Sequence, residues 1–292
     1  MPQPPELADV IRRGRFEVDT NAIGRDRFIS VSDCRNGRVV LTDYSKGNFY
    51  LFSPMHPAQG ITALPWTQIP IAIRDKRFGC CPFVLLAEGS RDGISYTAVT
   101  LMVSDSLEVK VQLSDFQTGA WTQVRTSEII EAPQPGRGLR QLLLASGKLY
   151  VLYMPGYIIE LDLLSMKISC IKLPDGVEYG CITNIRLSRA DGPGFYLVHA
   201  KLFQIHVWCY SMNDGGSTGN WILFDTICLH KALRHLAACS TLQSRLPLVH
   251  VAAVGDNANF LFFRIGLEIF YSLRSKISVI HVVQNLYYLS IK

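Results

Sequence analysis

The sequence predicts an all-β protein, a β-propeller of about five to six blades with little helix. From about Phe28 to the end, short apolar runs alternate with clusters of Gly, Asn, Asp, Ser and Pro. Residues 107–113 and 159–163 alternate apolar and polar side chains with the period of two typical of a half-buried strand. Long helical patterns are absent, and the best helix candidate, residues 229–238, is short.

Other apolar runs indicate strands that are covered on both faces. Residues 149–153 and 260–263 are apolar throughout, as expected for central strands. Such strands need a neighbouring layer on each side. Residues 205–210, in contrast, alternate with the period of two, with one face of Ile, Val and Cys and another face of His, Trp and Tyr, and are therefore predicted to form a half-buried strand.

A hairpin unit recurs along the chain: an apolar strand, a turn of small or polar residues, and a second strand. The turns centre on Ala58, Gln117, Ser165, Gly216 and Ser275, at intervals of 59, 48, 51 and 59 residues. Repeats of roughly 40 to 50 residues that each hold about four strands are typical of propeller blades. Material for a sixth blade lies in residues 16–40 combined with the C-terminal strand, or in residues 83–103.

A β-sandwich is the alternative architecture. The intervals are less regular than those of WD40 repeats, and the sequence holds no Trp-Asp dipeptide.

Composition and charge exclude several function classes. Hydrophobic residues make up 48% and charged residues 18% of the 292 residues, enough apolar surface for a packed core. The net charge is +5, but the densest basic stretch, residues 6–38, interleaves seven arginines with six acidic residues. Because phosphate binding needs uncompensated positive charge, we expect no nucleic-acid binding.

Cysteine usage and hydropathy predict a protein of the cytoplasm or nucleus. The eight cysteines include no C-x-x-C pair, and several lie within apolar runs, which is typical of free thiols in a reducing compartment. No secretory signal pattern follows Met1. Residues 47–73 carry no charge, but four prolines and two glycines interrupt them, so no membrane span is expected.

The motifs that resemble catalytic or metal sites favour structural interpretations. Residues 215–219 match the G-x-S-x-G nucleophile elbow, yet an apolar strand follows where that motif requires a helix. The adjacent Cys80 and Cys81 have no second pair to complete a tetrahedral metal site, and the seven histidines show no metal-binding spacing. Gly136-Arg137-Gly138 lacks the third glycine of a dinucleotide fingerprint. We therefore predict no catalytic, metal or cofactor-binding residues.

Four tryptophans and four aspartates are candidate site residues. Trp121 and Trp221 each open the second strand of a repeat unit, which predicts a shared packing role; Trp66 and Trp208 do not share that position. Exposed aromatics that bind protein are the alternative. A propeller enzyme or sugar-binding protein needs clustered carboxylates, but the candidate aspartates do not share one repeat position: Asp43, Asp115, Asp162 and Asp225.

A set of short matches resembles the propeller region of the plant F-box-associated proteins, especially the grass-type branch. The likeness covers about residues 28–285. The matching segments are residues 33–41 (DCRNGRVVL), 49–54 with 63–65, 147–151 (GKLYV), 173–177 (LPDGV), 203–208 (FQIHVW) with 219–223 (GNWIL), and 255–258 with 260–265.

The resemblance implies a kelch-like, non-catalytic module that recognises the substrate protein of an SCF-type ubiquitin ligase. In that family an N-terminal F-box docks on a Skp-type adaptor. Residues 1–27 show no F-box pattern and are expected to be poorly ordered, with the propeller in residues 28–292. Binding of the adaptor is therefore not expected, and the target protein is unknown. The alternatives are a sugar-binding or hydrolytic propeller that acts at its central channel, and a non-functional truncated paralogue.

Overall fold

A computed structural model describes most of the β-structure of the chain. The residues described are 29–35, 38–43, 48–54, 56–64, 78–86, 96–117, 120–133, 141–154, 156–177, 184–211, 219–229, 249–255, 258–265, 268–273 and 276–283. They form two compact units, and the chain passes from the first to the second between Glu131 and Ala132. The predicted helix at residues 229–238 lies outside the described residues, apart from Leu229.

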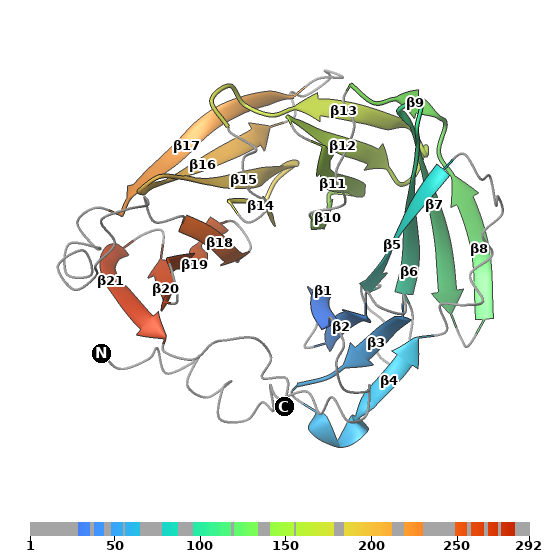
Figure 1. The fold of residues 1–292 in the computed structure, drawn as a ribbon, viewed down its shortest axis with the longest axis horizontal. Coiled ribbons are helices and arrows are strands. Elements are labelled where there is room, and N and C mark those ends of the chain that lie inside the picture. The colour runs from blue at the N-terminus through green and yellow to red at the C-terminus, as the bar shows by residue number, and fades with distance from the viewer. Residues whose placement is uncertain are drawn as a thin grey trace. The chain divides into compact units, whose positions relative to one another are not determined.

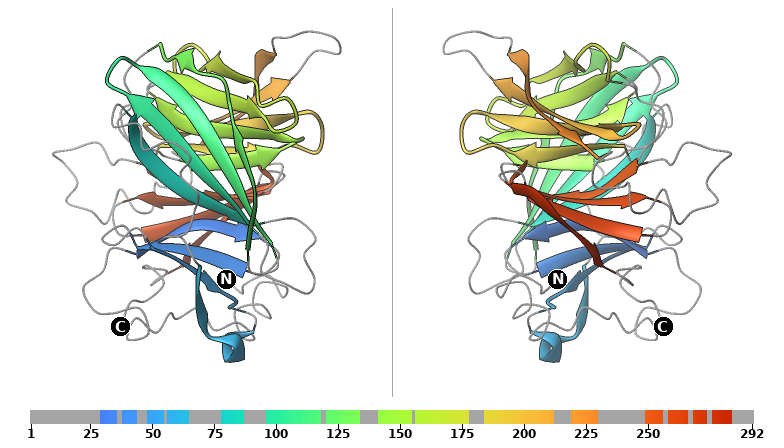
Figure 2. Two further views of the ribbon diagram at one scale, coloured as in Figure 1. Left: turned by 90° about the vertical axis from the view of Figure 1, so that its right-hand side faces the viewer. Right: turned by 90° about the vertical axis from the view of Figure 1, so that its left-hand side faces the viewer.

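The first unit contains two antiparallel sheets, whose strands follow one another in chain order (Figure 1). Sheet A consists of β1 (Ile29–Arg35), β2 (Arg38–Asp43), β3 (Asn48–Phe52) and β4 (Ile61–Leu64), with the short 3-10 helix η2 (Pro57–Gln59) between β3 and β4. Sheet B consists of β5 (Phe78–Leu86), β6 (Tyr96–Ser104), β7 (Glu108–Gln117), β8 (Ala120–Thr126) and β9 (Ile130–Glu131). Both β8 and β9 pair with β7, and Figure 2 shows the long strands of sheet B strongly twisted.

The second unit contains three four-stranded antiparallel sheets with the same sequential order. Sheet C consists of β10 (Gln141–Ala145), β11 (Lys148–Met154), β12 (Tyr157–Asp162) and β13 (Ile168–Lys172). Sheet D consists of β14 (Ile185–Arg189), β15 (Gly194–Lys201), β16 (Gln204–Ser211) and β17 (Asn220–Cys228). Sheet E consists of β18 (Val249–Val254), β19 (Phe260–Ile265), β20 (Glu268–Leu273) and β21 (Lys276–Val283).

The five predicted hairpin units are the third and fourth strands of the five sheets. Of the stretch predicted to supply a sixth blade, residues 83–86 and 96–103 instead belong to β5 and β6, the first two strands of sheet B. Residues 29–35 and 38–40 likewise belong to sheet A. The sequence pattern predicts the third and fourth strands of each sheet but not the first two, because the third and fourth strands carry the clearest alternation between apolar runs and polar turns.

The first strands of successive sheets are neighbours within each unit. In the second unit β10 contacts β14, and β14 contacts β18; in the first unit β1 contacts β5. Polar side chains join these strands: the Gln141 amide donates to the Leu187 carbonyl at 2.9 Å and accepts from the Leu187 N–H at 2.7 Å. The Arg189 guanidinium donates to the Leu144 carbonyl at 2.8 Å, and the Ser188 hydroxyl donates to the Gly255 carbonyl at 2.6 Å.

Sheet D has an apolar core on each of its faces, which the alternation in residues 205–210 alone does not predict. Ile205 and Val207 pack with residues of sheet E, whereas Trp208 and Tyr210 pack with residues of sheet C. The β11 residues from Leu149 to Leu152 are fully buried, which confirms the prediction of a strand covered on both faces. Sheets of this kind are stable only when neighbouring sheets cover them.

The prediction that residues 107–113 form a half-buried strand was wrong. In β7, Lys110 is 5% exposed and Gln112 is 1% exposed, so the polar face is covered as well. The alternation arises from polar residues that are enclosed in the structure rather than turned toward water.

Candidate interaction surface

The two repeated tryptophans hold equivalent places in two ladders of stacked aromatic side chains. In sheet B, Tyr96 pairs with Phe116, and Phe116 pairs with Trp121, across three adjacent strands. Their ring centroids lie 4.8 Å apart for Tyr96 and Phe116, and 5.2 Å apart for Phe116 and Trp121. The rings pack with apolar residues of sheet A.

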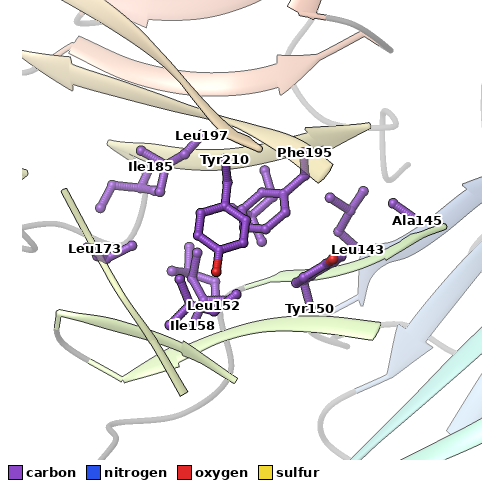
Figure 3. Packing of buried hydrophobic residues seen from close by; sticks show 12 residues of the cluster. Leu143, Ala145, Tyr150, Leu152, Ile158, Leu173, Ile185, Phe195, Leu197 and Tyr210 are labelled. Carbon is purple, nitrogen blue, oxygen red and sulfur yellow. The ribbon is translucent and has the colours of Figure 1, made fainter. Parts of the chain in front are cut away.

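Sheet D repeats this ladder with Phe195, Tyr210 and Trp221, which lie in its second, third and fourth strands, β15, β16 and β17. The ring centroids of Phe195 and Tyr210 lie 5.2 Å apart, and those of Tyr210 and Trp221 lie 5.0 Å apart. Tyr150 of sheet C extends the stack, with its ring centroid 4.3 Å from that of Phe195, and Figure 3 shows these rings between the two sheets. The predicted packing role of Trp121 and Trp221 is confirmed.

An indole hydrogen bond distinguishes the two ladders, whereas a buried tyrosine with a raised pKa is common to both. The indole N–H of Trp221 donates to the Lys172 carbonyl of sheet C at 2.7 Å, whereas the buried Trp121 Nε1 has no hydrogen-bond partner within the described chain. Burial raises the pKa of Tyr96 well above its ordinary value of 10.0. Burial, and then the charge of Glu160, do the same to the pKa of Tyr150.

Gly219, the last glycine of the G-x-S-x-G motif in residues 215–219, contacts Tyr210 of the aromatic ladder in sheet D. The Gly219 N–H donates to the Tyr210 hydroxyl at 3.0 Å. A Cβ atom at position 219 would lie 2.6 Å from the Tyr210 ring and 2.7 Å from the Ser211 carbonyl oxygen, so this position requires glycine. Strand β17 begins at the next residue, as the sequence predicted, and the motif serine, Ser217, lies outside the described residues.

The four candidate aspartates occupy different positions in their sheets. Asp43 ends β2 and is fully buried. Asp115 in β7 accepts a hydrogen bond from Thr97 at 2.7 Å and pairs with Arg125 at 3.3 Å.

The other two aspartates lie in the second unit. Asp162 closes the hairpin after β12 by accepting hydrogen bonds from the backbone and hydroxyl of Ser165, and these bonds lower its pKa. Asp225 in β17 accepts from the Thr226 N–H at 2.7 Å. The contacts of Asp115, Asp162 and Asp225 described above are all within their own sheets.

The remaining predicted motifs fall on varied positions. Cys80 and Cys81 lie in β5, where they pair with Met102 and Leu101. Among the described residues, no group of three His, Cys, Asp or Glu side chains could hold a metal ion. Gly136-Arg137-Gly138 and Trp66 lie outside the described residues. No helix in the described part of the chain has the length and apolar character needed to cross a membrane.

The outer strand of sheet D carries an exposed apolar triad, which we define as Ile222, Leu223 and Phe224. Their exposed fractions are 56%, 47% and 51%. The last strands of sheets A, B and C expose mainly small or polar side chains among those described: Thr62 and Ala63 in β4, Ala120, Thr122, Val124 and Thr126 in β8, and Ser169 and Lys172 in β13. Three adjacent exposed apolar residues on a strand mark a candidate binding surface.

Sequence reasoning did not identify the triad, because the run from Trp221 to Phe224 has the apolar character of a covered strand. Only its place as the last strand of its sheet separates it from a core strand. Within the described chain, β17 pairs with β16 alone, and Phe224 is an extra residue at a register shift in that pairing.

Comparison with known proteins identifies a family. A family model described as "F-box protein AT5G49610-like, beta-propeller" matches residues 30–287. The match decides between the two predicted architectures in favour of the propeller and confirms the family suggested by the short sequence matches. No curated protein matches the sequence at a significant level.

Several solved structures show distant similarity. The fission yeast SREBP–SCAP binding domains match with 13% identity and a TM-score of 0.38, over 87% of this chain and 59% of that chain. An ACO/RPE65 chimera matches with 10% identity and a TM-score of 0.44, over 89% and 59%. Glutaminyl cyclase of Myxococcus xanthus matches with 12% identity and a TM-score of 0.35, over 85% and 88%. The chain thus spans about 59% of the length of the first two structures.

Proposed function

Because this chain belongs to the F-box protein AT5G49610-like β-propeller family, we propose that it is a non-catalytic protein-interaction module that holds the substrate protein of an SCF-type ubiquitin ligase. The observation that carries the proposal is the family match over residues 30–287. A propeller serves this purpose well, since its core fixes the blades while their outer strands and loops remain free to vary.

The exposed triad supports a binding role. Ile222, Leu223 and Phe224 contribute little to the core, so an exposed apolar run at this place is not explained by folding. Apolar and aromatic anchors supply most of the binding energy in protein interfaces. The local hydrogen bonds of Asp115, Asp162 and Asp225 favour structural roles over catalysis for those carboxylates.

A location in the cytoplasm or nucleus belongs to the same proposal. Cys170, Cys209 and Cys228 are free thiols, and Cys228 is exposed. Exposed thiols remain reduced in those compartments, where ubiquitin ligases of this type act.

The proposal is tested by capturing partners with the tagged protein in its own cells and measuring how long those partners persist. We expect the wild-type protein to capture partners whose lifetime after translation arrest lengthens when the gene is deleted. Restoring the wild-type gene should shorten that lifetime again, and proteasome inhibition should block the shortening. Co-capture of a Skp-type adaptor would show that the ligase assembles on the cellular protein.

Two comparisons make this test selective. The variant I222T/L223T/F224T should lose the captured partners, whereas I129T, which removes an apolar residue that is 50% exposed in the connection between β8 and β9, should keep them. Captured partners whose lifetimes do not respond to gene deletion would contradict the role of substrate receptor.

A further inference from the structure

The outer edge of β17 has the backbone features of a strand that accepts another strand. Within the described chain, β16 is its only pairing partner, so the outward N–H and C=O groups of β17 bond to no other described strand. Proteins ordinarily protect such edges with charged residues, prolines or short strands. β17 is nine residues long and has Asp225 as its one charged residue.

The side chains of β17 add apolar contacts on both sides of this edge. Ile222 pairs with Cys209 and Leu223 pairs with Trp208, so these neighbours project to opposite faces of sheet D. Phe224 lies at the register shift, and its ring centroid is 5.7 Å from that of Tyr196. A segment that pairs with this edge can therefore bury apolar side chains on both of its own faces.

Asp225, directly after the triad, favours a positive charge on any segment that pairs with β17. Its Oδ1 atom accepts from the Thr226 N–H, and no Lys or Arg within the described chain forms an ion pair with it. The corresponding strand β8 has Arg125, which pairs with Asp115. A cation on an incoming segment would supply Asp225 with a partner that its own sheet lacks.

We propose that β17 binds an extended segment of a partner protein, which adds to sheet D as an antiparallel strand and places apolar side chains against the triad and a Lys or Arg against Asp225. In an antiparallel pairing, the residues opposite Asp225 come earlier in the incoming chain than those opposite Ile222. The basic residue should therefore precede the apolar residues. This inference rests on the proposed function, for which it names the recognition mode.

The first experiment selects nine-residue random peptides displayed on phage with the purified full-length protein. We expect enriched peptides to contain an apolar run preceded by Lys or Arg. D225K should reverse that preference to Asp or Glu, because it reverses the charge beside the triad. Enrichment that D225K leaves unchanged would overturn the proposed role of Asp225.

The second experiment measures fluorescent synthetic copies of the enriched peptides. I222T/L223T/F224T should weaken binding at least tenfold, whereas I129T should not change it. Methylating the backbone nitrogens of alternate peptide residues should abolish binding for one alternate set and spare the other, because only one set faces the strand edge. Equal effects of the two sets would rule out strand addition.

The oligomeric state provides a further decisive outcome. We expect the wild-type protein and the triad variant to be monomers with the same melting temperature in light-scattering and thermal measurements. A wild-type dimer that the triad substitutions dissociate would show that a second copy covers β17, and would overturn the proposal. Peptide binding without any effect on partner lifetime would contradict the substrate-receptor role but leave strand addition in place.

Discussion

Strands β8 and β17 close their sheets in the same way but present different surfaces. The second residue of each is a tryptophan that ends an aromatic ladder, Trp121 in one and Trp221 in the other. After the tryptophan, β8 continues with Thr122 and Gln123, whereas β17 continues with Ile222 and Leu223. The tryptophan common to both strands packs in the core of the fold. The residues after it can differ where they are exposed and do not pack in that core. The proposed binding role therefore rests on the outward residues of the last strand.

The largest effect on stability is expected from removing the two tryptophans, one at the end of each ladder. We expect Trp121→Ala and Trp221→Ala each to lower the free energy of unfolding by about 3 kcal/mol, because each deletes a ring that packs against two other rings. Chemical denaturation of the two variants measures the effect. A loss below about 1 kcal/mol in one variant only would show that the ladders are not equivalent.

Alkaline pH should reveal the buried tyrosines at the inner ends of the ladders. The pKa values of Tyr96 and Tyr150 are raised in the folded protein, so folding favours their protonated form. Their contribution is complete below the ordinary pKa of 10.0 and is lost as the pH rises above it.

We expect the free energy of unfolding to fall by on the order of 1 kcal/mol between pH 9 and 11. Tyr96→Phe and Tyr150→Phe should each flatten that decline, as measured by urea denaturation at several pH values. The Tyr96 hydroxyl is buried without a hydrogen-bond partner in the described chain, so Tyr96→Phe should not be less stable at neutral pH. A neutral-pH loss would mean that the hydroxyl has a stabilising partner.

Replacing each tryptophan by phenylalanine tests the one hydrogen bond that the Trp221 ladder has and the Trp121 ladder lacks. Trp221→Phe removes the bond to the Lys172 carbonyl and should cost about 1 kcal/mol more than Trp121→Phe, whose indole nitrogen is unpartnered in the described chain. Thermal denaturation of the two variants is the measurement. Equal costs would assign no net stabilisation to the bond between sheets C and D.

The outward residues should have the smallest effect on stability. We expect I222T/L223T/F224T to change the free energy of unfolding by less than about 1 kcal/mol, because all three side chains are at least 47% exposed. The reciprocal graft T122I/Q123L/V124F in β8 of that variant should leave stability similarly unchanged. Peptide binding that reappears with the graft would show that the apolar run is sufficient, whereas its absence would show that the apolar run needs the surroundings of β17, where Phe224 lies at the register shift, a place that Thr122 takes in β8.

Much of the fold was predictable because the outer hairpins combine apolar strands with polar turns at regular spacing. The positions of Trp121 and Trp221 within those hairpins also predicted their packing. The environment of a polar residue was harder to predict, as Lys110 and Gln112 show, because alternation does not reveal that a neighbouring layer covers the polar face.

The triad illustrates the opposite difficulty. Residues 221–224 resemble a covered strand in composition, and their exposure depends on the absence of a further strand beside β17 in the described chain. That information lies in the topology of the whole sheet rather than in any local pattern. The same holds for the inner strands, whose contacts involve residues far apart in sequence, such as Gln141 and Leu187.

The hydrogen bonds of Gln141 to Leu187 can form only after both sheets C and D have left the ribosome during synthesis. The strands within each sheet follow one another in the chain, so a sheet can assemble soon after it leaves the ribosome. Its partner across the aromatic stack arrives later, since 46 residues separate Gln141 from Leu187. At roughly 5 to 20 residues per second, an emerging sheet waits for several seconds with Tyr150 uncovered. Slow codons between β13 and β14 would prolong that wait and increase the dependence of the nascent chain on chaperones.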